Sequence, residues 1–272
     1  MTIQFLQNSL QHTKEAFETA ALTYDEGESR NEILKWMRGI VQEIYLQNFK
    51  AGDKLLELNA GTGTDALFLA GHGIHVLATD ISENMINTIE NKVKMQNAEN
   101  MVEARPCSFD KIEQIKESGF DGAMSNFGGL NCINKFDKLE DDLSSKIKQG
   151  GKFIAVVMNK TCPWEIFYYS LCFDFKNVFR RSKEEGIEAA LDNELVRTYY
   201  FTPAQFGGFF SRQFKVKKIY TLGLFSPPPF LIGIYRRFKP LVKLFMKTDE
   251  LLKGIFPFNR LGDHFIIIFE KT

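Results

Sequence analysis

The sequence predicts an α/β fold in which helices cover both faces of a largely parallel, doubly wound β-sheet. Between residues 54 and 158, short apolar runs alternate with amphipathic stretches. Strands that alternate with helices pair in parallel through right-handed crossovers, which place helices on both sides of the sheet. The chain has 272 residues, 44% hydrophobic and 25% charged, as in an ordinary globular protein with one sizeable core.

Two N-terminal helices are expected before the first strand. Over Gln11–Asp25 and Asn31–Phe49, apolar residues recur at helical spacing. Ser82 and Thr202 are expected N-caps of later helices, because their hydroxyls can accept hydrogen bonds from free backbone N–H groups. The apolar runs of strand length predict strands at Lys54–Asn59, Ile74–Thr79, Val102–Cys107, Phe120–Asn126 and Lys152–Met158.

Beyond the fifth strand, the regular alternation is interrupted twice. Two stretches, at about 160–200 and 227–261, are expected to be inserted helical lids. Val216–Leu224 and Phe265–Phe269 have the pattern of two final strands. The expected organisation is therefore a set of N-terminal cap helices in residues 1–50 and a core in residues 51–272 that carries both insertions.

The charge balance and the apolar pattern argue against several classes of function. The 34 Lys and Arg residues are balanced by 34 Asp and Glu residues, so no global positive field favours nucleic acid as a partner. The sequence has neither a signal-peptide pattern nor an apolar run of membrane-spanning length, so we expect a cytoplasmic protein. The four cysteines lack metal-ligand spacing, and no metal site is expected.

A turn of small residues after the first expected strand predicts a ligand site. Gly61 and Gly63 have no β-carbon and tolerate positive φ angles, so a ligand can approach their backbone closely. Asp80 follows the second expected strand, where an acidic side chain can accept hydrogen bonds from ribose hydroxyls. Both features belong to the carboxyl edge of a parallel sheet, and together they predict a ribose-bearing cofactor.

Two types of cofactor fit these positions, and the glycine spacing helps to separate them. A dinucleotide fingerprint prefers a third glycine three positions after the second, and here that residue is Ala66. Glu57, within the first expected strand, places a carboxylate near the turn. This carboxylate suits a cofactor with an ammonium group better than one with two phosphates, but an NAD-dependent oxidoreductase stays open as an interpretation.

The motifs in their order resemble those of the class I S-adenosylmethionine-dependent methyltransferases, in particular bacterial enzymes that act on small molecules. The N-terminal stretch Ala16–Asp25 resembles the helix that covers the cofactor in such enzymes. The resemblance implies a Rossmann-like, seven-stranded sheet whose last strand is antiparallel. The stretches that are similar to the successive family motifs are Glu57–Gly63, Asp80–Ile81, Cys107–Phe109, Phe120–Asn131 and Ile147–Val157.

The resemblance also implies which residues bind the cofactor, S-adenosyl-L-methionine. Asp80 would hold the ribose hydroxyls, while Ile81 and Phe109 would flank the adenine. Ser108 stands where many members have an acid that contacts the adenine amino group. Tyr24 would close over the cofactor. The implied cofactor-binding residues are Tyr24, Glu57, Asn59, Ala60, Gly61, Thr62, Gly63, Asp80, Ile81, Ser108, Phe109, Asn126, Phe127 and Gly128.

The methyl acceptor is expected to be a small, partly apolar or aromatic molecule. Methyl transfer depends on alignment and desolvation, and only some acceptors need a dedicated base. Aromatic residues of the insertions either line an apolar pocket or form the core of a lid. Gly128 and Gly129 either give the acceptor clearance or form a plain tight turn. His264 is a candidate catalytic residue, with a purely structural histidine as the alternative. The expected acceptor-binding residues are Gly129, Trp164, Tyr168, Phe225 and His264.

The second insertion also has the composition of a membrane-surface segment. Residues 230–256 interleave Arg and Lys with apolar side chains, which is typical of an interfacial helix and equally of a lid helix packed on the core. Transient membrane contact would suit a lipid-like acceptor such as a quinone precursor. The remaining alternative to a methyltransferase, besides the oxidoreductase, is a non-catalytic cofactor-binding or membrane-surface protein on the same fold.

Overall fold

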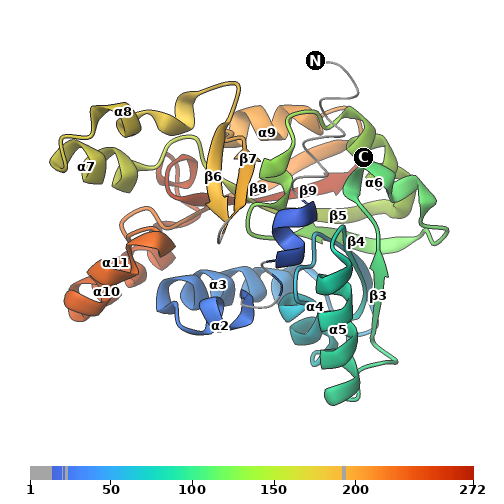
Figure 1. Cartoon of the computed structure of the whole chain (residues 1–272). Coiled ribbons are helices and arrows are strands. Elements are labelled where there is room, and N and C mark those ends of the chain that lie inside the picture. Colours follow the sequence, from blue (N-terminus) through green and yellow to red (C-terminus); the bar gives the residue numbers. More distant parts are fainter. Residues whose placement is uncertain (1–13, 20, 22–23, 192–193) are drawn as a thin grey trace.

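The computed structural model describes residues 14–19, 21, 24–191 and 194–272, and a seven-stranded β-sheet forms its centre (Figure 1). In sheet order the strands are β3 (Val102–Pro106), β2 (His75–Asp80), β1 (Lys54–Leu58), β4 (Phe120–Ser125), β5 (Ile147–Met158), β9 (His264–Lys271) and β8 (Phe214–Leu222). The first five pair in parallel, whereas β9 lies antiparallel to both of its neighbours. The expected sheet with an antiparallel last strand is confirmed.

Helices cover both faces of this sheet, as a doubly wound fold requires. α3 (Glu32–Asn48), α4 (Thr64–Ala70) and α5 (Glu83–Met95) lie on one face. The 3-10 turn η1 (Phe109–Gln114), α6 (Asp137–Lys146) and α9 (Pro203–Phe209) lie on the other. Ser82 and Thr202 accept backbone hydrogen bonds in the first turns of α5 and α9, which confirms both expected N-caps.

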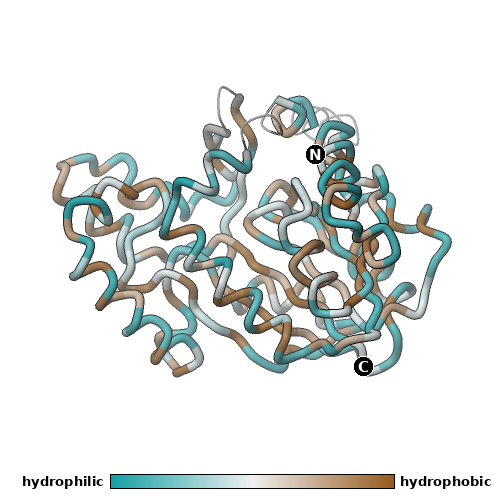
Figure 2. Tube along the Cα trace, turned by 90° about the horizontal axis from the view of Figure 1, so that it is seen from below, coloured by the Kyte–Doolittle hydropathy of each residue, from teal (hydrophilic) through white to brown (hydrophobic). Residues whose placement is uncertain are grey.

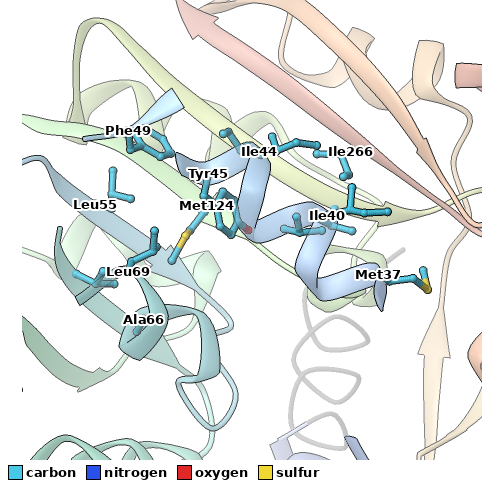
Figure 3. Packing of buried hydrophobic residues seen from close by; sticks show 14 of the residues in the cluster. Met37, Ile40, Ile44, Tyr45, Phe49, Leu55, Ala66, Leu69, Met124 and Ile266 are labelled. Carbon is cyan, nitrogen blue, oxygen red and sulfur yellow. The ribbon is translucent and has the colours of Figure 1, made fainter. Parts of the chain in front are cut away.

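The face under α3 has an aliphatic core (Figure 3). Ile40 and Ile44 of α3 pack toward Leu55, Met124 and Ile266 of three different strands, and each of these side chains is buried. Burial of one such side chain contributes about 1.5–3 kcal/mol relative to exposure. These contacts fix α3 against the strands that carry the candidate site.

The opposite face has an aromatic core. Phe206 of α9 and Phe210, the residue that follows this helix, pack against Phe153 of β5 and Phe269 of β9. Their ring centroids lie 5.1–6.2 Å apart in tilted arrangements, the range in which aromatic pairs attract one another. These four of the chain's 26 phenylalanines therefore pack the sheet and not a ligand pocket.

The first insertion follows β5 and contains a β-hairpin that was not expected. α7 (Pro163–Leu171), α8 (Phe175–Val178) and the turn η3 (Arg180–Ser182) precede β6 (Ile187–Leu191) and β7 (Glu194–Thr198), which pair antiparallel. The prediction of a wholly helical insertion is wrong. The two strands are only five residues each, and Val196 packs with Ala16 and Cys132, which only the tertiary structure brings together.

The second insertion follows β8 and is helical, as expected. It contains the turn η4 (Pro229–Leu231), α10 (Ile232–Arg237), α11 (Lys239–Leu252) and the turn η5 (Phe258–Arg260). Pro240 lies in the first turn of α11, where a missing N–H breaks no helical hydrogen bond. Because β5 and β8 both run antiparallel to β9, they share one direction, and both insertions leave the sheet at its carboxyl edge.

The N-terminal region is divided more finely than the expected helix over Gln11–Asp25. Residues 14–19 are helical, and α2 (Tyr24–Ser29) precedes α3. Residues 11–13, 20, 22 and 23 lie outside the described residues. Although α3 shares the core of the sheet, the division into cap and core at residue 50 stays a prediction. In the described part of the chain, no helix combines the length and the apolar content that crossing a membrane requires.

Candidate functional site

A pocket opens at the carboxyl edge of the sheet, where β1, β2 and β4 end. It encloses about 540 Å³, including the solvent space at its open mouth. Three of its lining residues, Phe17, Met85 and Cys132, were not predicted. The predicted residues that line it are Asn59, Gly61, Asp80, Ile81, Phe109, Asn126, Phe127 and Gly129.

The turn after β1 exposes backbone to this pocket. Gly61 and Gly63 have φ angles of 56° and 77°, in the left-handed region that favours glycine. A β-carbon on Gly63 would lie 2.9 Å from a side-chain carbon of Ile89, so the packing of α4 on α5 requires glycine there. A β-carbon on Gly61 would have no atom within 4 Å. Gly61 therefore leaves open space that a ligand can use.

Asp80, at the end of β2, is a buried carboxylate held by backbone N–H groups. It is 5% exposed and accepts hydrogen bonds from the backbone nitrogens of Gly61 at 2.9 Å and Ser82 at 3.0 Å. Burial raises the pKa of Asp80 to about 6, although these hydrogen bonds oppose the shift. Each carboxylate oxygen can accept a second hydrogen bond, so Asp80 can bind the hydroxyls of a diol in the pocket that it lines.

Apolar walls beside Asp80 come from Phe17, Ile81, Met85 and Phe109. Phe17 belongs to the helix over residues 14–19, which Glu18 anchors on α5. The Glu18 carboxylate accepts hydrogen bonds from the backbone nitrogens of Glu83 at 2.8 Å and Asn84 at 2.9 Å. A buried acid between flat apolar walls fits the ribose and the base of an adenosyl group. The Tyr24 side chain, predicted to close the site, lies outside the described residues.

Glu57 does not line the pocket, although a contact with a ligand's ammonium group was expected. Leu56 and Leu58 face the aromatic side of the sheet, so Glu57 between them faces α3. Glu57 is 2% exposed, and one of its carboxylate oxygens has no hydrogen-bond partner among the described residues. Burial and the nearby Asp65 raise the pKa of Glu57 well above its usual value. A charged contact between Glu57 and a ligand is therefore not supported.

A buried polar network that the sequence analysis missed supports the opposite wall. Arg38 of α3 donates hydrogen bonds to Glu28 and Asp65, and its guanidinium carbon lies 4.9 Å from the centre of the Phe127 ring. Asn126 Nδ2 donates to Asp65 at 2.6 Å, and Asn126 Oδ1 accepts from the Phe127 nitrogen at 3.0 Å. The network therefore holds Phe127 in place. The signal for it was an acidic residue, Asp65, at the start of an apolar helix.

Gly128 and Gly129 do not provide clearance for an acceptor. A β-carbon on Gly128 would lie 2.6 Å from Cε of Met158, and one on Gly129 would lie 2.2 Å from Cγ of Asn59. The chain's own side chains thus occupy the space that the two glycines leave. The two glycines allow Met158 and Asn59 to pack behind the pocket wall. Contact of Gly128 and Gly129 with an acceptor stays a prediction. Gly129 itself still lines the pocket.

The other residues predicted for the cofactor do not line the pocket: Ala60, Thr62, Gly63, Ser108 and Gly128. The Thr62 hydroxyl instead donates to Asp25 Oδ1 at 2.6 Å, and Asp25 pairs with Lys92 at 2.6 Å, so the turn is tied to α2 and α5. Oγ of Ser108 is buried and has no hydrogen-bond partner among the described residues. Cofactor contact of these residues stays a prediction.

His264 begins β9 and belongs to a second buried network. Its Nδ1 lies 2.9 Å from Asp263 Oδ2, while Arg181 donates to Asp263 Oδ1 at 2.6 Å and to Glu165 Oε1 at 2.7 Å. Burial would raise the pKa of Asp263, but its interactions with His264 and Arg181 outweigh burial and hold this pKa well below its usual value. Asp263 is therefore ionised, so Nδ1 of His264 carries the hydrogen of this bond.

The His264 ring contacts the pocket wall from behind. Its centroid lies 5.8 Å from that of Phe127 in an edge-to-face arrangement with an interplanar angle of 76°. His264 is 7% exposed and does not itself line the pocket. In the described part of the chain, its second ring nitrogen, Nε2, has no recorded hydrogen-bond partner. Phe127 thus lines the pocket and contacts the His264 ring, while His264 lies outside the pocket lining.

The aromatic residues predicted for the acceptor lie between the two insertions. Nε1 of Trp164 donates a hydrogen bond to the carbonyl oxygen of Phe225. The Tyr168 ring packs on Tyr169, with ring centroids 5.4 Å apart. None of Trp164, Tyr168 and Phe225 lines the described pocket, and their contact with an acceptor stays a prediction.

A larger hollow of about 770 Å³ lies at the opposite, amino edge of the sheet, where β1, β2, β3 and β4 begin. Ligands of open α/β sheets bind outside the carboxyl ends of the strands. We therefore place the candidate site at the pocket that contains Asp80.

Comparisons with known proteins identify a domain that contains most of the residues lining this pocket. Residues 55–151 match a family model described as a methyltransferase domain. A demethylmenaquinone methyltransferase of Leptospira interrogans is 29% identical over 157 residues, which span 56% of this chain and 62% of that protein. An uncharacterised protein of Methanocaldococcus jannaschii is 30% identical over 188 residues, which span 68% of this chain and 67% of that protein.

A solved structure supports the fold alone. The geranyl diphosphate C-methyltransferase of Streptomyces coelicolor A3(2), in complex with S-adenosyl-L-homocysteine, aligns with a TM-score of 0.56. The alignment covers 86% of this chain and 81% of that chain, at 12% sequence identity.

Proposed function

We propose that this chain, which belongs to the class I S-adenosylmethionine-dependent methyltransferases, transfers a methyl group to a small, partly apolar ring compound such as a quinol or a phenol. The observation that carries the proposal is the pocket at the carboxyl edge, where a buried acid, an open glycine turn and apolar walls meet. The name of the Leptospira interrogans relative, demethylmenaquinone methyltransferase, supports a quinone-like acceptor.

The residues of the pocket have distinct roles in this proposal. Asp80 would accept hydrogen bonds from the ribose hydroxyls, and Ile81 and Phe109 would pack on the adenine. When bound, S-adenosylmethionine supplies an electrophilic methyl group. Phe127, fixed by Arg38, would exclude water from the reacting end of the pocket, and exclusion of water strengthens the electrostatic interactions there.

His264 is proposed as the general base. Because ionised Asp263 accepts the Nδ1 hydrogen, the lone pair of the imidazole is on Nε2, where it can accept a proton. As the acceptor's oxygen or carbon forms its bond to the methyl carbon and the bond from that carbon to sulfur breaks, the acceptor's proton would move to Nε2 of His264. Because His264 lies behind Phe127 and does not line the pocket, this transfer would pass through one water molecule. Asp263 would then stabilise the positive imidazolium. This arrangement suits acceptors with an acidic O–H or C–H bond.

The test is transfer of isotope-labelled methyl groups from S-adenosylmethionine to a panel of demethylated quinols and phenols. For wild type, we expect turnover of at least one ring acceptor. For His264→Asn, we expect kcat to fall by about 100-fold or more, the contribution of a general base, with the Kd of S-adenosylhomocysteine unchanged. His72→Asn is the matched control, because His72 is exposed and bonds only within α4 and its C-terminal turn.

Two outcomes would favour the other interpretations. Tight binding of S-adenosylhomocysteine without turnover across the whole panel would indicate a non-catalytic binding protein. Stronger thermal stabilisation by NAD than by S-adenosylhomocysteine would indicate an oxidoreductase. Equal kcat values for wild type and His264→Asn would exclude His264 as the base while leaving methyl transfer itself intact.

A further inference from the structure

The two insertions expose large apolar side chains to solvent at one end of the molecule. In the first insertion, Leu171, Phe173 and Phe175 are 62%, 81% and 69% exposed. In the second, Leu244, Leu251 and Phe256 are 59%, 77% and 75% exposed. These side chains belong to two segments that leave the sheet at the same edge, and apolar side chains exposed together in this way mark a contact with a partner or a membrane.

α11 shows that these exposed residues do not belong to the core of a lid. Its buried side chains are Val242, Met246 and Asp249, which lie on one face at helical spacing. Leu244 and Leu251 are seven residues apart, on nearly the opposite face, which points to solvent. A helix that only packs on the core has one apolar face, whereas α11 has two. The outer apolar face has no partner among the described residues.

The second insertion carries an excess of positive charge. Residues 227–256 contain six Arg and Lys side chains and two acidic ones, in a chain whose formal net charge is zero. Both acids are engaged elsewhere: Asp249 accepts from the backbone nitrogens of Phe225 and Ser226, and Glu250 accepts from Trp36 Nε1 at 2.7 Å. Lys243 and Lys247 flank the outer apolar face of α11 and are exposed.

The two insertions form one continuous end of the molecule. Trp164 of α7 donates to the carbonyl oxygen of Phe225, and the guanidinium of Arg180 lies 5.8 Å from the centre of the Phe230 ring. Figure 1 shows α7 and α8 above α10 and α11 at the left of the molecule, and Figure 2 shows hydrophobic and hydrophilic residues alternating along this end. This end adjoins the carboxyl edge of the sheet, where both insertions begin.

We propose that the outer face of the insertions, formed by residues 171–175 and 238–256, docks on an anionic phospholipid bilayer. The exposed leucine and phenylalanine side chains would enter the boundary between headgroups and acyl chains, and the basic side chains would contact the lipid phosphates. The inference goes beyond the proposed function, because it concerns where the protein binds and not what it methylates.

Charge favours a bilayer over a second copy of the chain as the occupant. A two-fold symmetric dimer through this face would bring together two sets of the four lysines in residues 238–256. Protein interfaces are also depleted in lysine at their centres, whereas Lys243 and Lys247 lie beside the apolar face. An anionic lipid surface instead complements both the charge and the apolar side chains.

The experiment measures sedimentation of the full chain with vesicles of phosphatidylglycerol and phosphatidylcholine, and with vesicles of phosphatidylcholine alone. We expect wild type to bind the anionic vesicles at least about 10-fold more tightly, and less tightly in high salt. Leu244→Ser with Leu251→Ser, and separately Lys243→Glu with Lys247→Glu, should each weaken binding about 10-fold or more. Met95→Ser is the matched control, because Met95 is 82% exposed on α5.

The Kd of S-adenosylhomocysteine should be the same in all these variants, which separates this inference from the proposed function. Equal vesicle binding by wild type and the leucine variant would overturn the inference. So would a concentration-dependent dimer in analytical ultracentrifugation that the leucine substitutions abolish, if the wild type does not bind vesicles. That second result would identify the face as an interface between copies of the chain.

Discussion

Two buried carboxylates at the carboxyl edge of the sheet, Asp80 and Asp263, have opposite electrostatic environments. Asp80 is bound only by backbone N–H groups among the described residues, and burial raises its pKa to about 6. Asp263 contacts Arg181 and His264, and these interactions outweigh burial and hold its pKa well below the usual value. Both side chains are buried to a similar degree, so burial alone does not explain why their pKa values shift in opposite directions. The difference comes from Arg181 and His264, which contact Asp263 but not Asp80.

The comparison separates a carboxylate that stabilises the fold from one that is available to a ligand. The charge of Asp263 is compensated within the protein, so it can orient His264. The charge of Asp80 is compensated only in part, which costs stability and leaves capacity to accept hydrogen bonds from a ligand. Strongly perturbed acids in clefts are typical of functional sites.

The largest expected effect is loss of stability in Asp263→Asn. This substitution removes one of the two ionised partners of the buried Arg181 and leaves Glu165 as the other. Because loss of a partner from a buried ion pair typically costs about 3–5 kcal/mol, we expect a loss of up to this size in the free energy of unfolding. Chemical denaturation followed by circular dichroism measures the change. The control is Glu113→Gln, because its ion pair with Lys138 is on the surface and should contribute less than about 1 kcal/mol. Similar losses in both variants would contradict the assigned role of Asp263.

Asp80→Asn should have the next largest effect, on ligand binding. Replacing an ionised acceptor by a neutral one removes about 1.5–3 kcal/mol per hydrogen bond to a charged group, so the Kd of S-adenosylhomocysteine should rise about 10-fold to 100-fold at pH 8. Isothermal titration calorimetry measures it. An unchanged Kd would show that Asp80 does not bind the ribose.

The affinity of wild type should also depend on pH. Because the pKa of Asp80 is about 6, the carboxylate is ionised at pH 8 and mostly protonated at pH 5. The Kd should therefore rise by about 10-fold between pH 7 and pH 5, at most one factor of ten for each pH unit below the pKa. Asp80→Asn should lack this dependence, and the same dependence in both proteins would assign it to another group.

The smallest expected effect is a gain in stability in Asp80→Asn, opposite in sign to the loss expected in Asp263→Asn. The raised pKa of Asp80 means that the folded state binds the proton more tightly than the unfolded state, so stability falls as pH rises from about 4 to about 6. Without ligand at pH 8, Asp80→Asn should therefore be about 1 kcal/mol more stable than wild type, after the weaker backbone hydrogen bonds are allowed for. Thermal melts at pH 5 and pH 8 test this, since the gain should disappear at pH 5.

The site residues that could be predicted are those marked by a pattern within a few residues of the chain. Gly61 and Asp80 were found because a glycine turn after one strand and an acid after the next have fixed positions in a parallel sheet. Glu57 lies in the first strand, as predicted, but its neighbours in the sequence did not show that its side chain faces α3 and not the pocket. Arg38 and Asp65 were missed because no local pattern links residues on two different helices.

The sequence by itself determined the order of strands and helices, the doubly wound sheet, both tested N-caps and the glycine turn, because each rests on periodicity or backbone chemistry within a few residues. Only the tertiary structure decided that Asp263 orients His264, that Val196 belongs to a hairpin, and that the leucines of α11 face outward. The physical reason is that charge compensation and burial are properties of neighbours in space, and these neighbours are distant in the chain.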